Sequence, residues 1–138
     1  GDTFNLGDIN IVVVNMEGHT TGSVGFLIKE DSLLVTSDAA CPFVWLFLKE
    51  STSVSTYINM LENILQFNFN GFLVGHGVGK ILPRQKIIDF LNCAKNISLE
   101  KLVKVTFNNF ENLNSYCYTL GKMYNQEDCG VVYDPSKL

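Results

Sequence analysis

The chain has 138 residues, of which 46% are hydrophobic and 17% charged, a composition typical of an ordinary globular domain with a buried core. Its formal net charge is −4 and its basic residues form no cluster, so we expect no nucleic-acid partner. The longest nearly uncharged stretch, residues 32–48, is interrupted by Asp38 and Pro42 and is too short to cross a bilayer, so we expect no membrane partner.

The first half of the chain contains three apolar runs, residues 9–16, 24–29 and 33–36, which predict three successive strands. Residues 41–50 follow, with apolar and aromatic side chains on every side and no helical or strand period. We expect this segment to cap a cleft or to cover the core. Its aromatic residues Phe43, Trp45 and Phe47 could form a substrate wall, although packing in a core or interface is the usual role of such side chains.

The next segments alternate between helix and strand. Apolar residues recur every three or four positions from Ser53 to Phe67, which predicts a helix with one buried stripe. Residues 72–74 predict a short strand, and Pro83 is expected in the first turn of a second helix that runs through Ala94. Residues 102–107, 116–120 and 130–133 are strand-like, although the first run could continue a helix. Since no repeat or linker divides the chain, we expect a single domain over residues 1–138.

The cysteines and the amino terminus bear on location. Cys41, Cys93, Cys117 and Cys129 are widely spaced and include no Cys-x-x-Cys, which favours buried or free thiols over a disulfide pair or a zinc site. The first residues lack the basic and apolar regions of a signal peptide, so the protein is intracellular or a signal has been removed. Together these features favour a cytoplasmic location.

The only two histidines lie in glycine-flanked turns after predicted strands, in Gly18-His19 and in Gly75-His76-Gly77, and Asp38 ends a third apolar run. Glycine permits close approach of the backbone, so such turns direct side chains from a rigid scaffold into a cleft. Taken singly, each histidine could be a hydrogen-bonded turn residue, and Asp38 could stabilise a turn or cap a helix. Taken together, the three residues are candidate metal ligands at three strand ends.

The order of these motifs resembles the metallo-β-lactamase superfamily over about residues 1–97. The resemblance is carried by Gly-Asp-Thr-Phe-x-Leu-Gly at residues 1–7, Gly-His-Thr-x-Gly-Ser at 18–23, Ser-Asp-Ala at 37–39 and Gly-His-Gly at 75–77. It implies a mixed α+β or α/β fold, namely the carboxy-terminal half of an αββα sandwich with two main helices.

The resemblance also implies a site. In this family two zinc ions, or iron, activate a bridging water for hydrolysis of a small-molecule substrate. By resemblance, His19 would bind the first metal, Asp38 would bridge both metals with the bound water as the catalytic centre, and His76 would bind the second. Imidazole and carboxylate groups suit either metal. The residues that bind the substrate are not indicated.

The chain departs from the family pattern at three points. Glu17 and Ser37 replace the usual proline and glycine, and the family motif His-x-His-x-Asp-His, which supplies most of the other ligands, is absent. Catalytic zinc normally has three protein ligands and a water. We therefore expect weak metal binding and no efficient hydrolysis by this chain alone.

Two hypotheses follow for what the chain does. In the first, it is a fragment of a metal-dependent hydrolase, completed by the missing amino-terminal half. In the second, it is a noncatalytic homo-oligomeric remnant or binding module with vestigial ligand positions. A half-sandwich exposes a large apolar face, so we expect a homodimer, a domain-swapped pair or a complex with the missing half.

Overall fold

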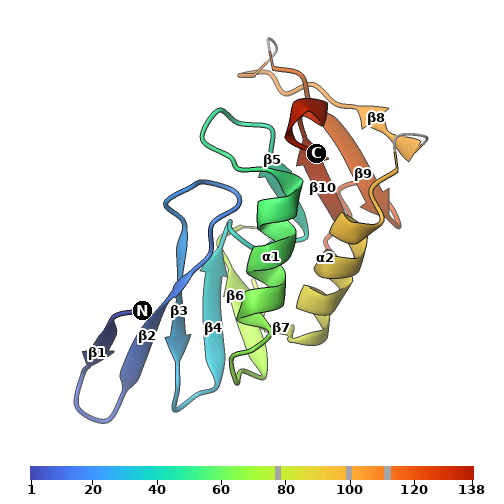
Figure 1. Ribbon diagram of the computed structural model, residues 1–138. Coiled ribbons are helices and arrows are strands. Elements are labelled where there is room, and N and C mark those ends of the chain that lie inside the picture. Colours follow the sequence, from blue (N-terminus) through green and yellow to red (C-terminus); the bar gives the residue numbers. More distant parts are fainter. Residues whose placement is uncertain (77–78, 99–100, 111–112) are drawn as a thin grey trace.

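The computed structural model describes residues 1–76, 79–98, 101–110 and 113–138. Within these residues the strands form two sheets (Figure 1). The larger sheet has the order β1-β2-β3-β4-β6-β7, with strands β1 (Thr3–Asn5), β2 (Asn10–Asn15), β3 (Val24–Ile28), β4 (Leu33–Ser37), β6 (Gly71–Val74) and β7 (Leu82–Pro83). The smaller sheet has the order β5-β10-β9-β8, with strands β5 (Phe43–Leu46), β8 (Val103–Lys104), β9 (Tyr116–Leu120) and β10 (Cys129–Tyr133).

Two α-helices, α1 (Val54–Ile64) and α2 (Gln85–Lys95), lie side by side in front of the larger sheet, and η2 (Pro135–Lys137) is a short 3-10 helix (Figure 1). The side chain of Ser53 caps α1 by accepting a hydrogen bond from the Thr56 N–H at 3.1 Å. Each helix buries one stripe, and α2 also contacts β9 and β10. The helices therefore join both sheets around one hydrophobic core.

Strand direction places three strand ends on one edge of the larger sheet. Strand β3 is antiparallel to both β2 and β4, and β4 is parallel to β6. Consequently β2, β4 and β6 all run in the same direction, and their carboxyl ends lie at the same edge. The turns that follow these strands are brought near one another by this topology, although they are far apart in the sequence.

The two faces of the larger sheet are both apolar, but only one is covered. One row of register partners belongs to or packs against the core: Val12, Leu27, Leu34, Phe72 and Leu82. The neighbouring row faces the other way and packs against neither described hydrophobic cluster: Val13, Phe26, Val35 and Leu73. Phe26 is 40% exposed. Because side chains alternate across a strand, this second row marks an uncovered apolar face.

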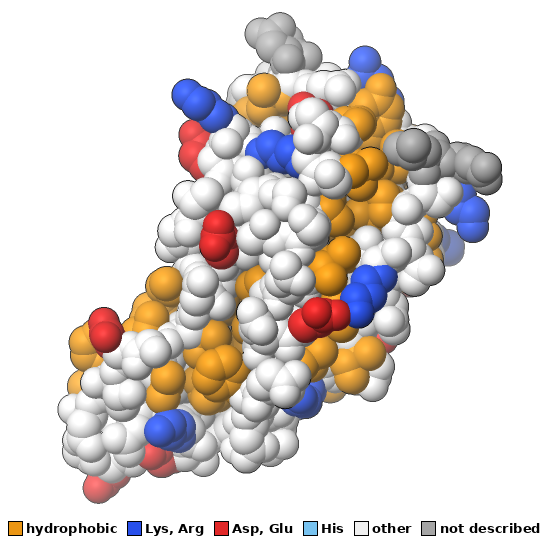
Figure 2. Space-filling model, in the orientation of Figure 1, with side chains coloured by type: hydrophobic (Ala, Val, Ile, Leu, Met, Phe, Trp, Pro, Cys, Tyr) orange, Lys and Arg blue, Asp and Glu red, His pale blue; other side chains and the backbone are white. Residues whose placement is uncertain are grey.

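Exposed apolar side chains also gather at the free edge of the same sheet. Figure 2, in the orientation of Figure 1, shows hydrophobic side chains at the lower left, where β1 to β3 extend beyond α1. Phe4, Leu6 and Ile9 are exposed in this part of the chain. Neighbouring exposed apolar side chains of this kind are typical of a region that meets another layer of protein.

The structure confirms the predicted mixed α+β class with two helices, and it confirms the strands β2, β3, β4, β6, β9 and β10 and the helix α1. The prediction for residues 41–50 was incomplete, because they contain strand β5. Val44 and Leu46 are buried in the main core, whereas Phe43 and Trp45 pack on a second cluster around Phe47. A strand that contacts apolar neighbours on both faces shows no alternation of polar and apolar residues.

Two boundaries were wrong. Pro83 lies in β7 rather than in the first turn of α2, which begins at Gln85. Because β7 is an edge strand, the missing N–H of proline leaves its pairing with Gly71 intact. Of residues 102–107, only Val103 and Lys104 form a strand, β8, which pairs with β9 at the edge of the smaller sheet. The single domain over residues 1–138 stays a prediction.

Within the described ranges, no helix has the length and apolar character that crossing a membrane requires. The cytoplasmic location stays a prediction. The four cysteines are free, as expected from their spacing.

Candidate functional site

The three candidate ligands line one cavity of about 520 Å³. His19 follows β2, Asp38 follows β4 and His76 follows β6, so all three come from the carboxyl ends of the strands that share a direction. The other residues that line the cavity are Cys41, Pro42, Phe43, Trp45, Leu48, Tyr124 and Gln126. The sequence-based grouping of the three residues is thus matched by a shared pocket, whereas their metal-binding role stays a prediction.

Asp38 and His76 are in direct contact. The Nε2 atom of His76 lies 3.1 Å from Oδ2 of Asp38. The His76 side chain is 84% exposed and that of Asp38 is 35% exposed, so water reaches this pair. Gly75 allows the two to meet, because a Cβ atom at this position would lie 2.6 Å from Oδ1 of Asp38.

A strained residue directs Asp38. Ser37 has φ of +48°, in the left-handed region that side-chain-bearing residues rarely adopt. The pairing of β4 with β6 shifts register between Val35 and Ser37, which marks a local bulge at this point. Such irregularities re-aim a side chain at the end of a strand. The family pattern has glycine here, and the backbone conformation explains why glycine would suit the position.

His19 is held by the segment that contains β5. Its Nδ1 atom lies 2.8 Å from the carbonyl oxygen of Trp45, and the hydroxyl of Ser51 donates to the carbonyl of His19 at 2.7 Å. A carbonyl oxygen only accepts hydrogen bonds, so Nδ1 carries the proton. The neutral ring then has its lone pair on Nε2, which is the tautomer that binds a metal through that atom.

Cys41 also lines the cavity, and its thiol donates to the carbonyl of Asp38 at 3.7 Å. Burial raises the pKa of Cys41 to about 12, and the negative charge of Asp38 acts in the same direction. Because the thiolate is the form that binds metals and attacks electrophiles, Cys41 is a protonated wall residue at neutral pH.

An aromatic wall faces the three candidate ligands. Phe43 and Tyr124 lie with ring centroids 5.3 Å apart, and Trp45 packs on Phe107 at 4.5 Å and on Phe47 at 5.2 Å. The packing predicted for these aromatic residues is therefore confirmed, whereas a substrate wall stays a prediction. Phe43 and Trp45 line the cavity, whereas Phe47 is buried in the cluster behind them.

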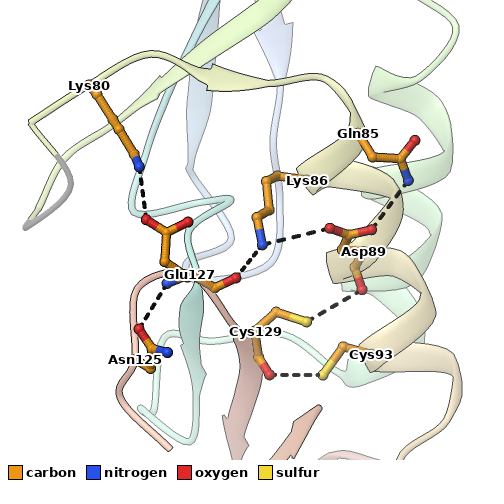
Figure 3. A network of polar contacts seen from close by, with 8 residues as sticks. All are labelled: Lys80, Gln85, Lys86, Asp89, Cys93, Asn125, Glu127 and Cys129. Atoms are coloured by element: carbon orange, nitrogen blue, oxygen red, sulfur yellow. Dashed lines mark hydrogen bonds and ion pairs between the residues drawn. The ribbon is translucent and has the colours of Figure 1, made fainter. Parts of the chain in front are cut away.

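A polar network fixes the loop that carries Tyr124 and Gln126 (Figure 3). Lys80 lies 2.8 Å from Oε1 of Glu127, and this hydrogen bond lowers the pKa of Glu127. Lys86 of α2 donates to the carbonyl of Glu127 and lies 3.7 Å from Asp89. The loop between β9 and β10 is thereby tied to α2 and to Lys80.

Comparison with solved structures identifies the architecture. ETHE1 from Myxococcus xanthus matches with a TM-score of 0.57 and 20% identity, over 72% of this chain and 46% of that one. A metallo-beta-lactamase from Pontibacter korlensis matches with a TM-score of 0.55 and 13% identity, over 70% of this chain and 46% of that one. A metallo-beta-lactamase superfamily protein from Sulfolobus tokodaii matches with a TM-score of 0.53 and 16% identity, over 78% of this chain and 41% of that one. The chain has part of the metallo-β-lactamase fold.

The chain spans less than half the length of each of these metallo-β-lactamase-like structures. No protein-family model matches the sequence, and no curated protein matches it. The likeness is therefore one of three-dimensional fold, and it agrees with the motif order of residues 1–97.

The donors of this partial metallo-β-lactamase fold fit a metal in kind but not in number. Two imidazoles and a carboxylate suit zinc or iron, and the tautomer of His19 suits coordination. Yet among the residues that the structure describes, no three His, Cys, Asp or Glu side chains are grouped closely enough to hold an ion. Asp38 and His76 are in contact, while His19 lines the same cavity without joining them in a group of three ligands. The described residues do not make a complete metal centre.

Sequence reasoning missed two of the described residues that line the cavity. Tyr124 and Gln126 come from the loop between β9 and β10, and nothing in their local sequence connects them with His19 or Asp38. Their position depends on the parallel pairing of β5 with β10, which joins distant parts of the chain. Cys41, Pro42 and Leu48 belong to residues 41–50, which were expected to cap a cleft or cover the core, although strand β5 within them was not predicted.

Proposed function

We propose that this chain is the carboxy-terminal part of a metal-dependent hydrolase with the metallo-β-lactamase fold. Its contribution is three donors, His19, Asp38 and His76. The observation that carries the proposal is their meeting in one cavity at the carboxyl ends of β2, β4 and β6. When bound at such a site, a metal activates water and polarises the bond to be cleaved.

The missing donors come, in this proposal, from a complementary half that carries His-x-His-x-Asp-His. That half packs on the uncovered apolar face formed by Val13, Phe26, Val35 and Leu73. Burial of apolar side chains supplies the driving force, at about 25 cal/mol per Å² of apolar surface removed from water. The completed site would hydrolyse an ester, amide, thioester or phosphodiester.

The test is to read the coding sequence directly upstream and to express it with this chain as one polypeptide. We expect His-x-His-x-Asp-His upstream, a bound metal at stoichiometric amount, and loss of that metal in His76→Ala. The matched control is Glu62→Ala, which removes an ion pair with Lys95 on the helices and leaves the cavity untouched. Absence of the motif upstream, or equal metal content in both variants, contradicts the proposal.

A second candidate function is a noncatalytic homo-oligomer, favoured by the same uncovered face. Two copies that pair their larger sheets would hide Phe26, which is 40% exposed in the single chain. Light scattering tests this candidate, with Phe26→Lys as the interface variant and Glu62→Lys as the control. A dimer that Phe26→Lys converts to monomer supports it, and a monomeric mass of the unmodified chain rules it out.

A further inference from the structure

We propose that the cavity takes an uncharged ligand whose aromatic ring or short acyl chain packs against Phe43, Trp45 and Tyr124. The proposal rests on the proposed function, since it names the substrate class of the same site. It narrows that class to neutral aryl or acyl esters, thioesters and amides. Substrates that would place a carboxylate or phosphate against the aromatic wall are excluded.

The first support is the division of the cavity into two sides. His19, Asp38 and His76 stand at the sheet edge, whereas the remaining wall is built from β5, the residues after it and the loop between β9 and β10. That wall is mainly apolar and aromatic. A ligand that spans the cavity meets polar donors at one end and aromatic rings at the other, which is the usual design of a small-molecule site.

The second support is the rigidity of the wall. Trp45 is backed by Phe107 at 4.5 Å, by Phe47 at 5.2 Å and by Phe110 at 6.0 Å. Aromatic rings held in this way offer a preformed surface, so a ligand ring binds there without ordering loose side chains. Phe43 and Tyr124, 5.3 Å apart, form a second part of the same surface.

The third support is charge. Among the described residues that line the cavity, Asp38 is the acidic one, and there is no Lys or Arg. The nearby lysines are engaged elsewhere: Lys80 with Glu127, Lys86 with Asp89, and Lys137 with the carbonyls of Leu48 and Ser51. An anion packed against the aromatic wall, away from the three candidate ligands, would therefore have no cationic side chain to pair with, and an unpaired charge in an apolar site is costly.

The chain carries its own reporter for a binding test. Trp45 is the only tryptophan in the sequence and it lines the cavity, so its emission reports an absorbing ligand bound there. The probes are 8-anilinonaphthalene-1-sulfonate and the uncharged sulfonamide of the same ring system. Both absorb in the range of tryptophan emission and differ mainly in charge. The titration is done on the full chain with EDTA, without metal.

We expect the sulfonamide to quench Trp45 saturably and to bind about tenfold tighter than the sulfonate, a difference of about 1.4 kcal/mol. Gln126→Lys places a cation at the exposed rim of the cavity and should raise the affinity of the sulfonate. Tyr124→Ser should weaken both probes. Phe26→Ser lies on the uncovered sheet face and should leave the titration unchanged, and circular dichroism verifies that each variant is folded.

Equal affinity for the two probes overturns the inference, and so does a loss in Phe26→Ser as large as that in Tyr124→Ser, since the probe would then sit on the sheet. These results are independent of metal. Failure of the upstream sequence to supply the missing ligands would contradict the hydrolase, while a preference for the sulfonamide would still assign the chemistry of the cavity.

Discussion

The Nε2 atom of His76 lies 3.1 Å from Oδ2 of Asp38, across the ends of two parallel strands, β4 and β6. In the metal centre that we propose, both residues would be ligands, whereas in this structure they contact each other. Both are partly exposed, so their hydrogen bond is worth at most about 1 kcal/mol in water. A cost of this size is easily exceeded by metal binding, so the contact holds the donors together without blocking them.

Gly75 permits that contact, which leads to a prediction for Gly75→Ala. The added Cβ would lie 2.6 Å from Oδ1 of Asp38 and 3.0 Å from Oγ of Ser37, so the Asp38 carboxylate must move. We expect the ring-nitrogen signals of His76 in NMR spectra to shift, with a loss of about 1 kcal/mol in the free energy of unfolding. Gly22→Ala is the control, because a Cβ there meets nothing within 4 Å. Unchanged His76 signals in Gly75→Ala would show that the contact does not depend on glycine.

Ser37→Gly should stabilise the fold. A residue with a side chain in the left-handed region destabilises the folded state by about 1 kcal/mol, and glycine removes this strain. Part of the gain is offset because glycine also increases the conformational entropy of the unfolded chain. Ser32, also at φ of +48°, should respond in the same direction. Asn59→Gly, at an exposed position within α1, should instead lower stability. Urea unfolding measures the free energy of unfolding of all three variants. If Ser37→Gly lowered this free energy as much as Asn59→Gly does, strain at the positive φ of Ser37 would be refuted.

The candidate ligands could be found from sequence because their signals are local. Each of His19, Asp38 and His76 follows an apolar run, and the glycines beside the histidines mark turns. The uncovered face could also be anticipated, since β3 and β4 carry apolar residues in successive positions rather than in alternation. Local sequence patterns therefore predict where the strands of the larger sheet end and which of its faces are apolar.

The aromatic half of the cavity could not be predicted in this way. Strand β5 pairs with β10, which follows it by more than eighty residues, and Tyr124 reaches Phe43 only through that pairing. Trp45 also contributes through its backbone, since its carbonyl sets the tautomer of His19. No spacing rule connects a carbonyl with a histidine 26 positions away. The first contact depends on pairing within the smaller sheet, and the second depends on where that sheet lies beside the turn after β2.

The raised pKa of Cys117 predicts that the folded protein loses stability in alkaline solution. Burial raises the pKa of Cys117 to about 11, so the folded state keeps a proton that the unfolded chain releases near pH 8.5. The stabilisation is complete below about pH 8.5 and is lost as the pH rises towards 11, with a slope of up to about 1.4 kcal/mol per pH unit. Urea unfolding from pH 8 to 10.5 should show a shallower decline for Cys117→Ala. Val132→Ala is the control, because it opens space in the same cluster without removing a thiol, and an identical slope in Cys117→Ala would contradict the assignment.

Zinc titration of this chain alone separates a complete metal centre from a partial one. Among the described residues, Asp38 and His76 are in contact, while no third His, Cys, Asp or Glu joins them to hold an ion. Catalytic zinc sites take three protein ligands, so we expect calorimetry to give a dissociation constant weaker than about 10 μM, which corresponds to less than about 7 kcal/mol of binding free energy. His76→Ala should reduce the heat further, whereas Glu62→Ala on the helix surface should match the unmodified chain. Submicromolar affinity in the unmodified chain would mean that its own side chains rearrange into a full coordination sphere, and the need for a complementary half would disappear.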